Sequence, residues 1–182
     1  MSNLTTWSVD PTHTHIEFAV RHLMISTVKG RFAQFTGAVQ LDPADLASAS
    51  LDVTIDVASI DTRVADRDNH LRSADFFDAA AHPTITYASR KVERQGDTYR
   101  VIGDLTIRGV TREVPLAVSL EGQAKDPWGN QRMAFAATAK INRADFGLTW
   151  NAALEAGGVV VGDEVKISID VELIAAAAKA AA

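Results

Sequence analysis

Histidine is the residue type in this chain most able to bind a metal or transfer a proton. The sequence has five: His13, His15, His22, His70 and His82. His13 and His15 are two residues apart, a spacing that places both side chains on one face of a strand, as two zinc ligands require. His70 lies close in sequence to Asp66 and Asp68, and a histidine beside a carboxylate can act as an acid or a base. These two arrangements are the candidates for metal binding and for catalysis.

The rest of the chain supports neither chemistry. There is no cysteine, and so no thiolate to complete a zinc or redox site. The sequence also lacks a nucleophile elbow, a glycine-rich phosphate loop and a pair of carboxylates on an evidently buried face. A histidine hydrogen-bonded near the end of a barrel explains His22 equally well. We therefore predict a protein that is not an enzyme, with no catalytic residue, no bound metal and no cofactor.

Length and charge narrow the function further. The chain has 182 residues, with 18 Lys and Arg against 23 Asp and Glu, and a formal net charge of -5. Nucleic acids and anionic membrane surfaces attract basic faces, so we expect no nucleic-acid partner and no stable membrane insertion. Residues 1–11 have no basic segment followed by an apolar one, which predicts no secretory signal and hence a cytoplasmic location. We expect one barrel domain over residues 1–174 and an alanine-rich tail over residues 175–182.

Apolar and polar residues alternate with a period of two along much of the chain, which is typical of strands with one buried face. Pro115 interrupts one of these strands, because proline cannot donate a hydrogen bond to its neighbour. Turn sequences at residues 94–97 and 126–130 separate others. The predicted strands are residues 16–20, 29–41, 51–57, 84–92, 99–108, 114–120, 132–142 and 165–173.

About eight strands in hairpin order, each with one apolar face, would leave that face wet in an open sheet. Closing the sheet removes its edges and encloses the apolar face. We therefore predict an all-β protein that forms a closed antiparallel β-barrel. The alternation stops over residues 61–78, where residues 62–72 are predicted to form a short helix over one end of the barrel. Val64, Leu71 and the Phe76–Phe77 pair are the expected anchors of this helix.

An eight-stranded barrel is either filled by side chains or holds one slender ligand. Gly103, Ala137 and Ala139 share the inward face with large residues, which favours an unfilled interior. In the alternative, Phe and Leu side chains fill the barrel, and the protein is a structural or protein-interaction module. The side chains predicted to line an apolar, ligand-binding pore are Phe18, Val20, Val53, Ile55, Phe76, Phe77, Leu105, Ile107, Leu116 and Phe135. Phe76 and Phe77 could equally plug the barrel end.

Six segments taken together resemble the YceI-like, polyisoprenoid-binding family. They are residues 10–22, 59–62, 67–78, 83–87, 103–112 and 141–148, and they follow the order and spacing of that family. The resemblance covers nearly the whole chain, from about Trp7 to Ile174. It implies a lipocalin-like barrel that binds, stores or transports a long isoprenoid, such as a quinone precursor or a prenyl phosphate. The family is commonly periplasmic, which differs from the cytoplasmic location expected above.

The predicted helix and the end of the first predicted strand carry side chains that could bind a polar head group. His22, Arg67, His70 and Arg72 are side chains that could donate hydrogen bonds to a phosphate or quinone while the tail occupies the pore. The alternative for Arg67 is an ion pair with an outward carboxylate, Asp56 or Asp61, that only fixes the loop. The expected partner is an isoprenoid lipid or a similar apolar small molecule, and the chain is also compatible with a homodimer.

Five further residues match positions of the family. They are Asp10, His13, Arg143, Asp145 and Gly147. A buried network of hydrogen bonds around turns explains these residues as well as a binding role does.

Overall fold

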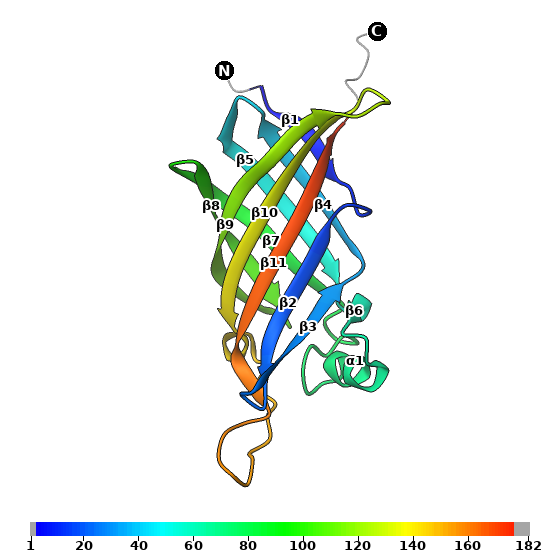
Figure 1. Ribbon diagram of the computed structural model, residues 1–182, viewed down its shortest axis with the longest axis vertical. Coiled ribbons are helices and arrows are strands. Elements are labelled where there is room, and N and C mark those ends of the chain that lie inside the picture. The colour runs from blue at the N-terminus through cyan, green and yellow to red at the C-terminus, as the bar shows by residue number, and fades with distance from the viewer. Residues whose placement is uncertain (1–2, 177–182) are drawn as a thin grey trace.

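The structure is a computed structural model that describes residues 3–176 (Figure 1). In that part of the chain, eleven strands form one antiparallel sheet. The strands are β1 (Thr5–Val9), β2 (His15–His22), β3 (Ser26–Phe32), β4 (Phe35–Asp42), β5 (Asp45–Asp56), β6 (Ile60–Asp61), β7 (Thr84–Gln95), β8 (Thr98–Ile107), β9 (Val110–Lys125), β10 (Gln131–Asn142) and β11 (Val161–Ala175). The helices are η1 (Val57–Ser59), α1 (Ala65–Arg72) and η2 (Arg143–Phe146). None of the helices in residues 3–176 has the length and apolar character needed to cross a membrane.

Eight of these strands close into a barrel. Their order around it is β1-β4-β5-β7-β8-β9-β10-β11, and β1 pairs with β11 through Trp7 opposite Ala175 and Val9 opposite Leu173. Most neighbours in the ring also follow one another in the sequence, as hairpins do. The prediction of an all-β, lipocalin-like closed antiparallel barrel with a short helical insertion at one end is therefore confirmed.

The wall of the barrel continues beyond this ring on β2, β3 and β6, toward α1 (Figure 1). β11 is long enough to serve both parts, because it pairs with β1 near its end and with β2 over Val165–Asp170. β1 and β2 thus occupy one position of the wall, separated by the turn at residues 10–14. β3 and β4 occupy the next position in the same way.

The strand predicted at residues 29–41 is wrong in one respect, because it is two strands with a break between them. At the break, the Ala33 amide donates to the Ser59 carbonyl at 3.2 Å and the Gln34 amide donates to the Ser59 hydroxyl at 3.0 Å. These bonds replace the ladder where β3 turns toward β2 and β6 while β4 turns toward β1 and β5. Alternation also does not reveal β1, because only Trp7 and Val9 carry the pattern there.

The helix α1 begins at Ala65 and not at Thr62, because Thr62 is engaged elsewhere. Its amide and its hydroxyl both donate to Asp68 Oδ1, at 2.9 and 2.5 Å, which folds the incoming chain back onto the helix. Val64 is 46% exposed and does not anchor the helix, contrary to expectation. Phe76 is the buried anchor, and Leu71 and Phe77 pack against the same core.

Gly103 is required by a neighbouring ring and does not mark unfilled volume. A Cβ atom at this position would lie 2.5 Å from Cζ of Tyr87. The Tyr87 hydroxyl donates to the Val114 carbonyl at 2.9 Å, and burial raises the pKa of this hydroxyl, so it stays a neutral donor. The use of Gly103 as a sign of a hollow interior was therefore wrong, and the evidence for a cavity lies elsewhere.

The last strand extends one residue beyond the predicted domain boundary. Ala175 pairs with Trp7, and the Ala176 amide donates to the Thr6 carbonyl at 2.9 Å. The rest of the predicted tail, residues 177–182, lies outside the described residues. The division into a domain at residues 1–174 and a tail stays a prediction.

Candidate ligand-binding cavity

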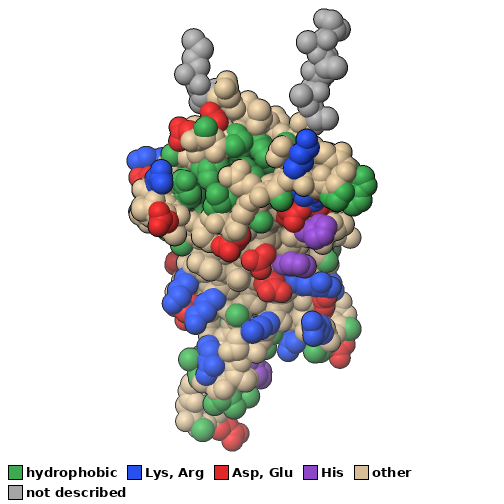
Figure 2. All heavy atoms as spheres, turned by 45° about the horizontal axis from the view of Figure 1, so that its top comes forward, with side chains coloured by type: hydrophobic (Ala, Val, Ile, Leu, Met, Phe, Trp, Pro, Cys, Tyr) green, Lys and Arg blue, Asp and Glu red, His purple; other side chains and the backbone are tan. Residues whose placement is uncertain are grey.

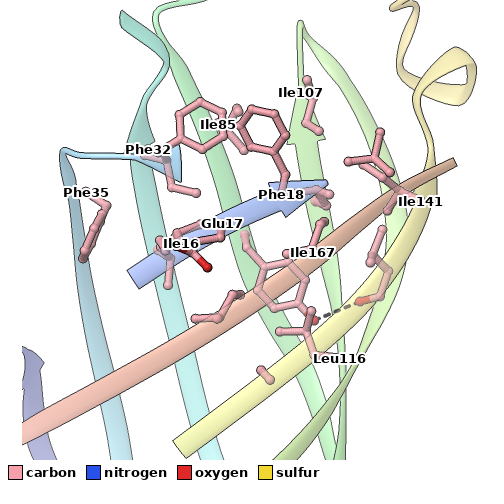
Figure 3. A pocket seen from close by; sticks show the side chains of 18 of the residues that line it. Ile16, Glu17, Phe18, Phe32, Phe35, Ile85, Ile107, Leu116, Ile141 and Ile167 are labelled. Carbon is pink, nitrogen blue, oxygen red and sulfur yellow. Dashed lines mark hydrogen bonds between the residues drawn. The ribbon is translucent and has the colours of Figure 1, made fainter. Parts of the chain in front are cut away.

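An apolar cavity of about 480 Å³ occupies the interior of the barrel. Each of the eight strands of the closed ring contributes inward-facing side chains to its wall, and α1 contributes others at one end. Figure 3 shows Phe18, Ile107 and Leu116, from β2, β8 and β9, pointing toward the same space. The volume lies within the range of about 300–1,000 Å³ that is usual for small-molecule sites.

The burial of mid-strand residues is further evidence that the interior is hollow. Val53 and Ile55 on β5, and Val165, Ile167 and Ile169 on β11, all face the cavity, yet each is only partly buried. Protein interiors are close-packed, so inward side chains in the middle of a filled barrel would be fully buried. Their remaining exposure is therefore to the cavity itself.

All ten side chains predicted to line an apolar pore lie in the wall of this cavity. They are Phe18, Val20, Val53, Ile55, Phe76, Phe77, Leu105, Ile107, Leu116 and Phe135. Eight of them are on strands, where alternation determines which face a side chain occupies. Phe76 and Phe77 reach the cavity from the segment that follows α1. Contact between these ten residues and a ligand stays a prediction.

Aromatic rings surround the cavity at the α1 end. The rings of His70 and Trp150 are 4.8 Å apart in an edge-to-face arrangement, and Phe76 lies 5.1 Å from His70 and 5.4 Å from Trp150. On the other side, Phe32 and Phe77 meet edge to face at 5.9 Å. Because Phe76 is only 6% exposed, it packs this end of the barrel as well as lining the cavity.

Three of the four predicted head-group residues, His22, Arg67 and His70, also line the cavity at this end. His70 Nε2 lies 2.8 Å from Asp75 Oδ2, and the His70 side chain is 39% exposed. A polar group of a ligand at this end would therefore meet nitrogen atoms, whereas the middle of the cavity presents carbon.

Arg72 is not in the wall of the cavity, and its guanidinium is used to hold the fold together. Its Nε donates to the Ala58 carbonyl and its Nη2 donates to the Ile60 carbonyl, both at 2.9 Å. These bonds attach the end of α1 to η1 and β6. We therefore remove Arg72 from the candidate site.

Arg67 pairs with neither of the carboxylates considered for it. Its Nε donates to the Thr62 hydroxyl at 2.7 Å and its Nη2 donates to the Thr62 carbonyl at 2.9 Å. Asp61 instead pairs with Arg31, at 3.1 Å, and Asp56 accepts the backbone hydrogen bond that caps η1. The ion-pair alternative is thus wrong in its partners, although Arg67 does hold the loop before α1.

Many residues of the wall were not predicted as part of it, and Trp150 and Arg143 are two of these at the α1 end. Trp150 lies in the irregular segment after η2, where no alternation exists to find it. Arg143 is 5% exposed, and its guanidinium donates to four backbone carbonyls at 2.7–3.3 Å, those of Leu148, Trp150, Val161 and Gly162. Burial lowers the pKa of Arg143, although Asp163 opposes the shift. Arg143 thus organises the turns at this end, as the hydrogen-bond interpretation predicts.

Of the two histidines considered as zinc ligands, His13 belongs to the group of potential metal ligands in residues 3–176, and His15 does not. His13 Nδ1 lies 2.9 Å from Asp10 Oδ2, and Asp10, His13 and Glu172 have potential ligand atoms within 4.8 Å of one another. Arg132 already supplies a positive charge to this group, because its Nη1 donates to Asp10 at 2.9 Å and also to Glu172. The cluster is thus explained as an ion network that joins β10 and β11 to the turn after β1.

This network predicts how stability depends on pH. Hydrogen bonds from Thr12 and His13, and from Arg132, hold the pKa of Asp10 well below its ordinary value of 3.8, although burial opposes them. A carboxyl with a depressed pKa stabilises the fold above its ordinary pKa, and this contribution is lost as the pH falls below that value. We expect Asp10→Asn to be less stable at pH 7 and to lose less stability on acidification than wild type.

Urea unfolding at pH values from about 7 down to about 2.5 tests this dependence. The matched control is Asp97→Asn in the exposed turn between β7 and β8, which should follow the wild-type curve. An unchanged acid dependence in Asp10→Asn would show that the network contributes nothing to acid sensitivity.

The fold and its interior together define a class of protein, a closed antiparallel barrel with an apolar internal cavity. A family model described as the YceI-like domain matches residues 7–173. The chain belongs to the YceI-like family, which confirms the resemblance found in its sequence.

Individual relatives agree with this assignment. A UPF0312 protein of Staphylococcus epidermidis is 39% identical over 170 residues, which are 93% of this chain and 97% of the relative. The crystal structure of BcnA from Burkholderia cenocepacia matches with a TM-score of 0.79 at 27% identity, covering 90% of this chain and 98% of that one. The Campylobacter jejuni YCEI protein matches with a TM-score of 0.73 at 35% identity, covering 85% and 88%.

A more distant structure shares the fold. A polyisoprenoid binding domain from Saccharophagus degradans matches with a TM-score of 0.67 at 18% identity, covering 94% of this chain and 99% of that one. At this identity the match concerns the architecture of the barrel alone.

Proposed function

We propose that this protein binds a long isoprenoid chain inside its barrel and stores or transports it. The observation that carries the proposal is the continuous apolar cavity, whose wall includes inward side chains from every strand of the closed ring. A ligand that fills it gains the transfer of apolar surface out of water. The same cavity is evidence against the alternative, in which side chains fill the barrel and the protein acts only as a structural module.

The shape and chemistry of the cavity favour an isoprenoid over a compact polar ligand. An eight-stranded barrel is only wide enough for one slender molecule. Wall residues such as Ile55, Leu116 and Ile167 offer no hydrogen-bond partner, so a polar group held beside them would stay unsatisfied. The polyisoprenoid binding domain from Saccharophagus degradans, which has the same architecture, supports this ligand class.

The head group of the ligand, a quinone or a phosphate, is proposed to lie at the α1 end. His22, Arg67 and His70 are in the wall there, and their nitrogen atoms can donate hydrogen bonds to a quinone or phosphate oxygen. Binding of the isoprenoid tail would then depend on the apolar cavity, and binding of the head group on these three residues.

The proposed role of the protein is that of a carrier and not of a catalyst. A cytoplasmic location and a homodimer complete the proposal, and cell fractionation and sedimentation analysis test these two points.

Trp150 provides a direct test, because it is the tryptophan in the wall of the cavity, whereas Trp128 is 81% exposed and Trp7 is packed outside it. In a Trp128→Phe background, geranylgeraniol should change the fluorescence with saturation at about one molecule per barrel. His70→Ala and a metal chelator should leave this affinity within about threefold, because the alcohol has no charged head. A fluorescence that does not respond to any prenyl alcohol would contradict the proposal, and a response abolished by chelation would revive a metal-dependent activity.

A further inference from the structure

The barrel wall divides at the end opposite α1. β5 and β7 pair only from Asp52 opposite Ala88 to Asp56 opposite Thr84. Beyond this point, residues 45–51 of β5 continue along β4, while residues 89–95 of β7 continue along β8. We call the space between these two segments the fork. In Figure 1 the hairpin of β7 and β8, in green at the left, leans away from β5.

A single side-chain bond marks the base of the fork. The Leu51 amide donates to the Ser89 hydroxyl at 2.9 Å, where a backbone carbonyl would otherwise continue the ladder. Above it, Leu46 on β5 is buried, whereas Ala49 and Leu51 on β5, Val92 on β7 and Tyr99 on β8 line the cavity while staying partly exposed. The cavity therefore reaches the fork.

The fork lies beside a buried apolar cluster, and Ala49 and Leu51 of β5 and Tyr99 of β8 pack against that cluster while staying partly exposed. The buried apolar cluster at this end is Trp7, Val39, Leu41, Leu46, Met133 and Leu173, and it comes from β1, β4, β5, β10 and β11. Within residues 3–176, neither β7 nor β8 adds a buried member to it. In Figure 2, with this end turned toward the viewer, hydrophobic side chains gather in a recess below the two termini. The opposite end is packed by buried Phe76 and Phe146.

The length of the cavity limits which isoprenoid chains it can enclose, so an opening at the fork affects which chains can bind. Val161 and Leu173 both line the cavity and are twelve residues apart on β11, about 40 Å at ~3.3 Å per residue, or about 30 Å along the axis at a usual strand tilt. An isoprene unit adds four skeletal bonds of about 1.5 Å each, or about 5 Å of extended chain. About six units therefore fill the bore, and a longer chain needs an exit.

We propose that the fork is that exit: the head group stays at the α1 end, and the tail of a chain longer than about six units leaves between β5 and β7. The inference rests on the proposed function and adds to it a specificity for the length of the chain. The protein accepts long polyprenyl chains without an upper limit on length. A barrel closed at this end would instead select chains that fit its bore.

The test compares geranylgeraniol, which has four units, with decaprenol, which has ten. Wild type should bind both. Ala49→Trp places an indole in the fork, so decaprenol should bind at least about tenfold more weakly while geranylgeraniol stays within about threefold. Ala47→Trp is the matched control, because Ala47 is exposed and outside the wall of the cavity, and it should bind both alcohols as wild type does.

Each outcome is decisive for one of the two proposals. If wild type binds neither alcohol, the proposed function fails. If wild type binds both and Ala49→Trp does not separate them, the fork is not an exit. If Ala49→Trp binds neither alcohol, the same comparison is made with Val92→Trp, which narrows the fork from β7. Weaker binding of decaprenol alone then supports the exit, and equal binding of both alcohols overturns it. A decaprenol analogue with a diazirine at its tail end should label residues 45–51 or 89–99 of wild type, and labelling confined to the middle of β9–β11 would overturn the exit.

Discussion

Replacing Ile55 with Trp should abolish most isoprenoid binding while leaving the protein folded. Ile55 lies near the end of β5 that leads to η1 and α1, opposite Phe35 on β4 and Ile85 on β7, and it faces the cavity. The indole therefore enters empty space across the path of a threaded chain. We expect geranylgeraniol to bind at least about thirtyfold more weakly, with the free energy of unfolding changed by less than about 1 kcal/mol.

The neighbouring position supplies the control for this prediction. Thr54 is exposed on the opposite face of the same strand, so Thr54→Trp adds the same ring outside the barrel and should leave binding unchanged. If the bore were filled, Ile55→Trp would overpack it and cost about 1–3 kcal/mol of stability. A destabilised Ile55→Trp protein, together with a wild type whose melting temperature no prenyl lipid raises, would contradict a hollow carrier.

The largest loss of stability should come from Arg143→Ala. This guanidinium is 5% exposed and satisfies the carbonyls of four residues in the turns at the α1 end. Removing it leaves buried acceptors without donors, and each such group costs about 1–3 kcal/mol. We expect urea unfolding to show a loss of at least about 3 kcal/mol.

The ion pair of Arg143 with Asp163 should contribute little to this effect. Asp163 Oδ1 lies 3.4 Å from Arg143, but the Asp163 side chain is 64% exposed, where water and salt screen the attraction. Asp163→Asn should therefore change stability by less than about 1 kcal/mol. A loss in Asp163→Asn as large as that in Arg143→Ala would show that charge, and not the satisfied carbonyls, is what Arg143 provides.

The sequence predicts the barrel well because alternation is a property of neighbouring residues. The inward faces of β5 and β11 can be assigned from it, and so can the position of Ile55 in the cavity wall. The pattern does not show where a strand changes partners. The break at Ala33 and Gln34, and the separation of β5 from β7 above Asp52, depend on contacts between distant segments.

The polar part of the site is harder to predict, because hydrogen-bond partners depend on the folded backbone. Arg67 and Arg72 are five residues apart on one short helix, yet only Arg67 lines the cavity. Arg72 is directed instead to the carbonyls of Ala58 and Ile60. A small residue on an inward face also does not show that space is empty, because Gly103 makes room for the ring of Tyr87.

Isoprenoid binding is tested most directly by identifying what the barrel contains when the protein is made in its own host. Protein purified without detergent is denatured and extracted with organic solvent, and the extract is analysed by mass spectrometry. We expect a prenyl lipid at about one molecule per barrel, since one slender chain fills the interior of an eight-stranded barrel. An extract that contains no prenyl lipid, or one that holds another compound in stoichiometric amount, would contradict isoprenoid binding.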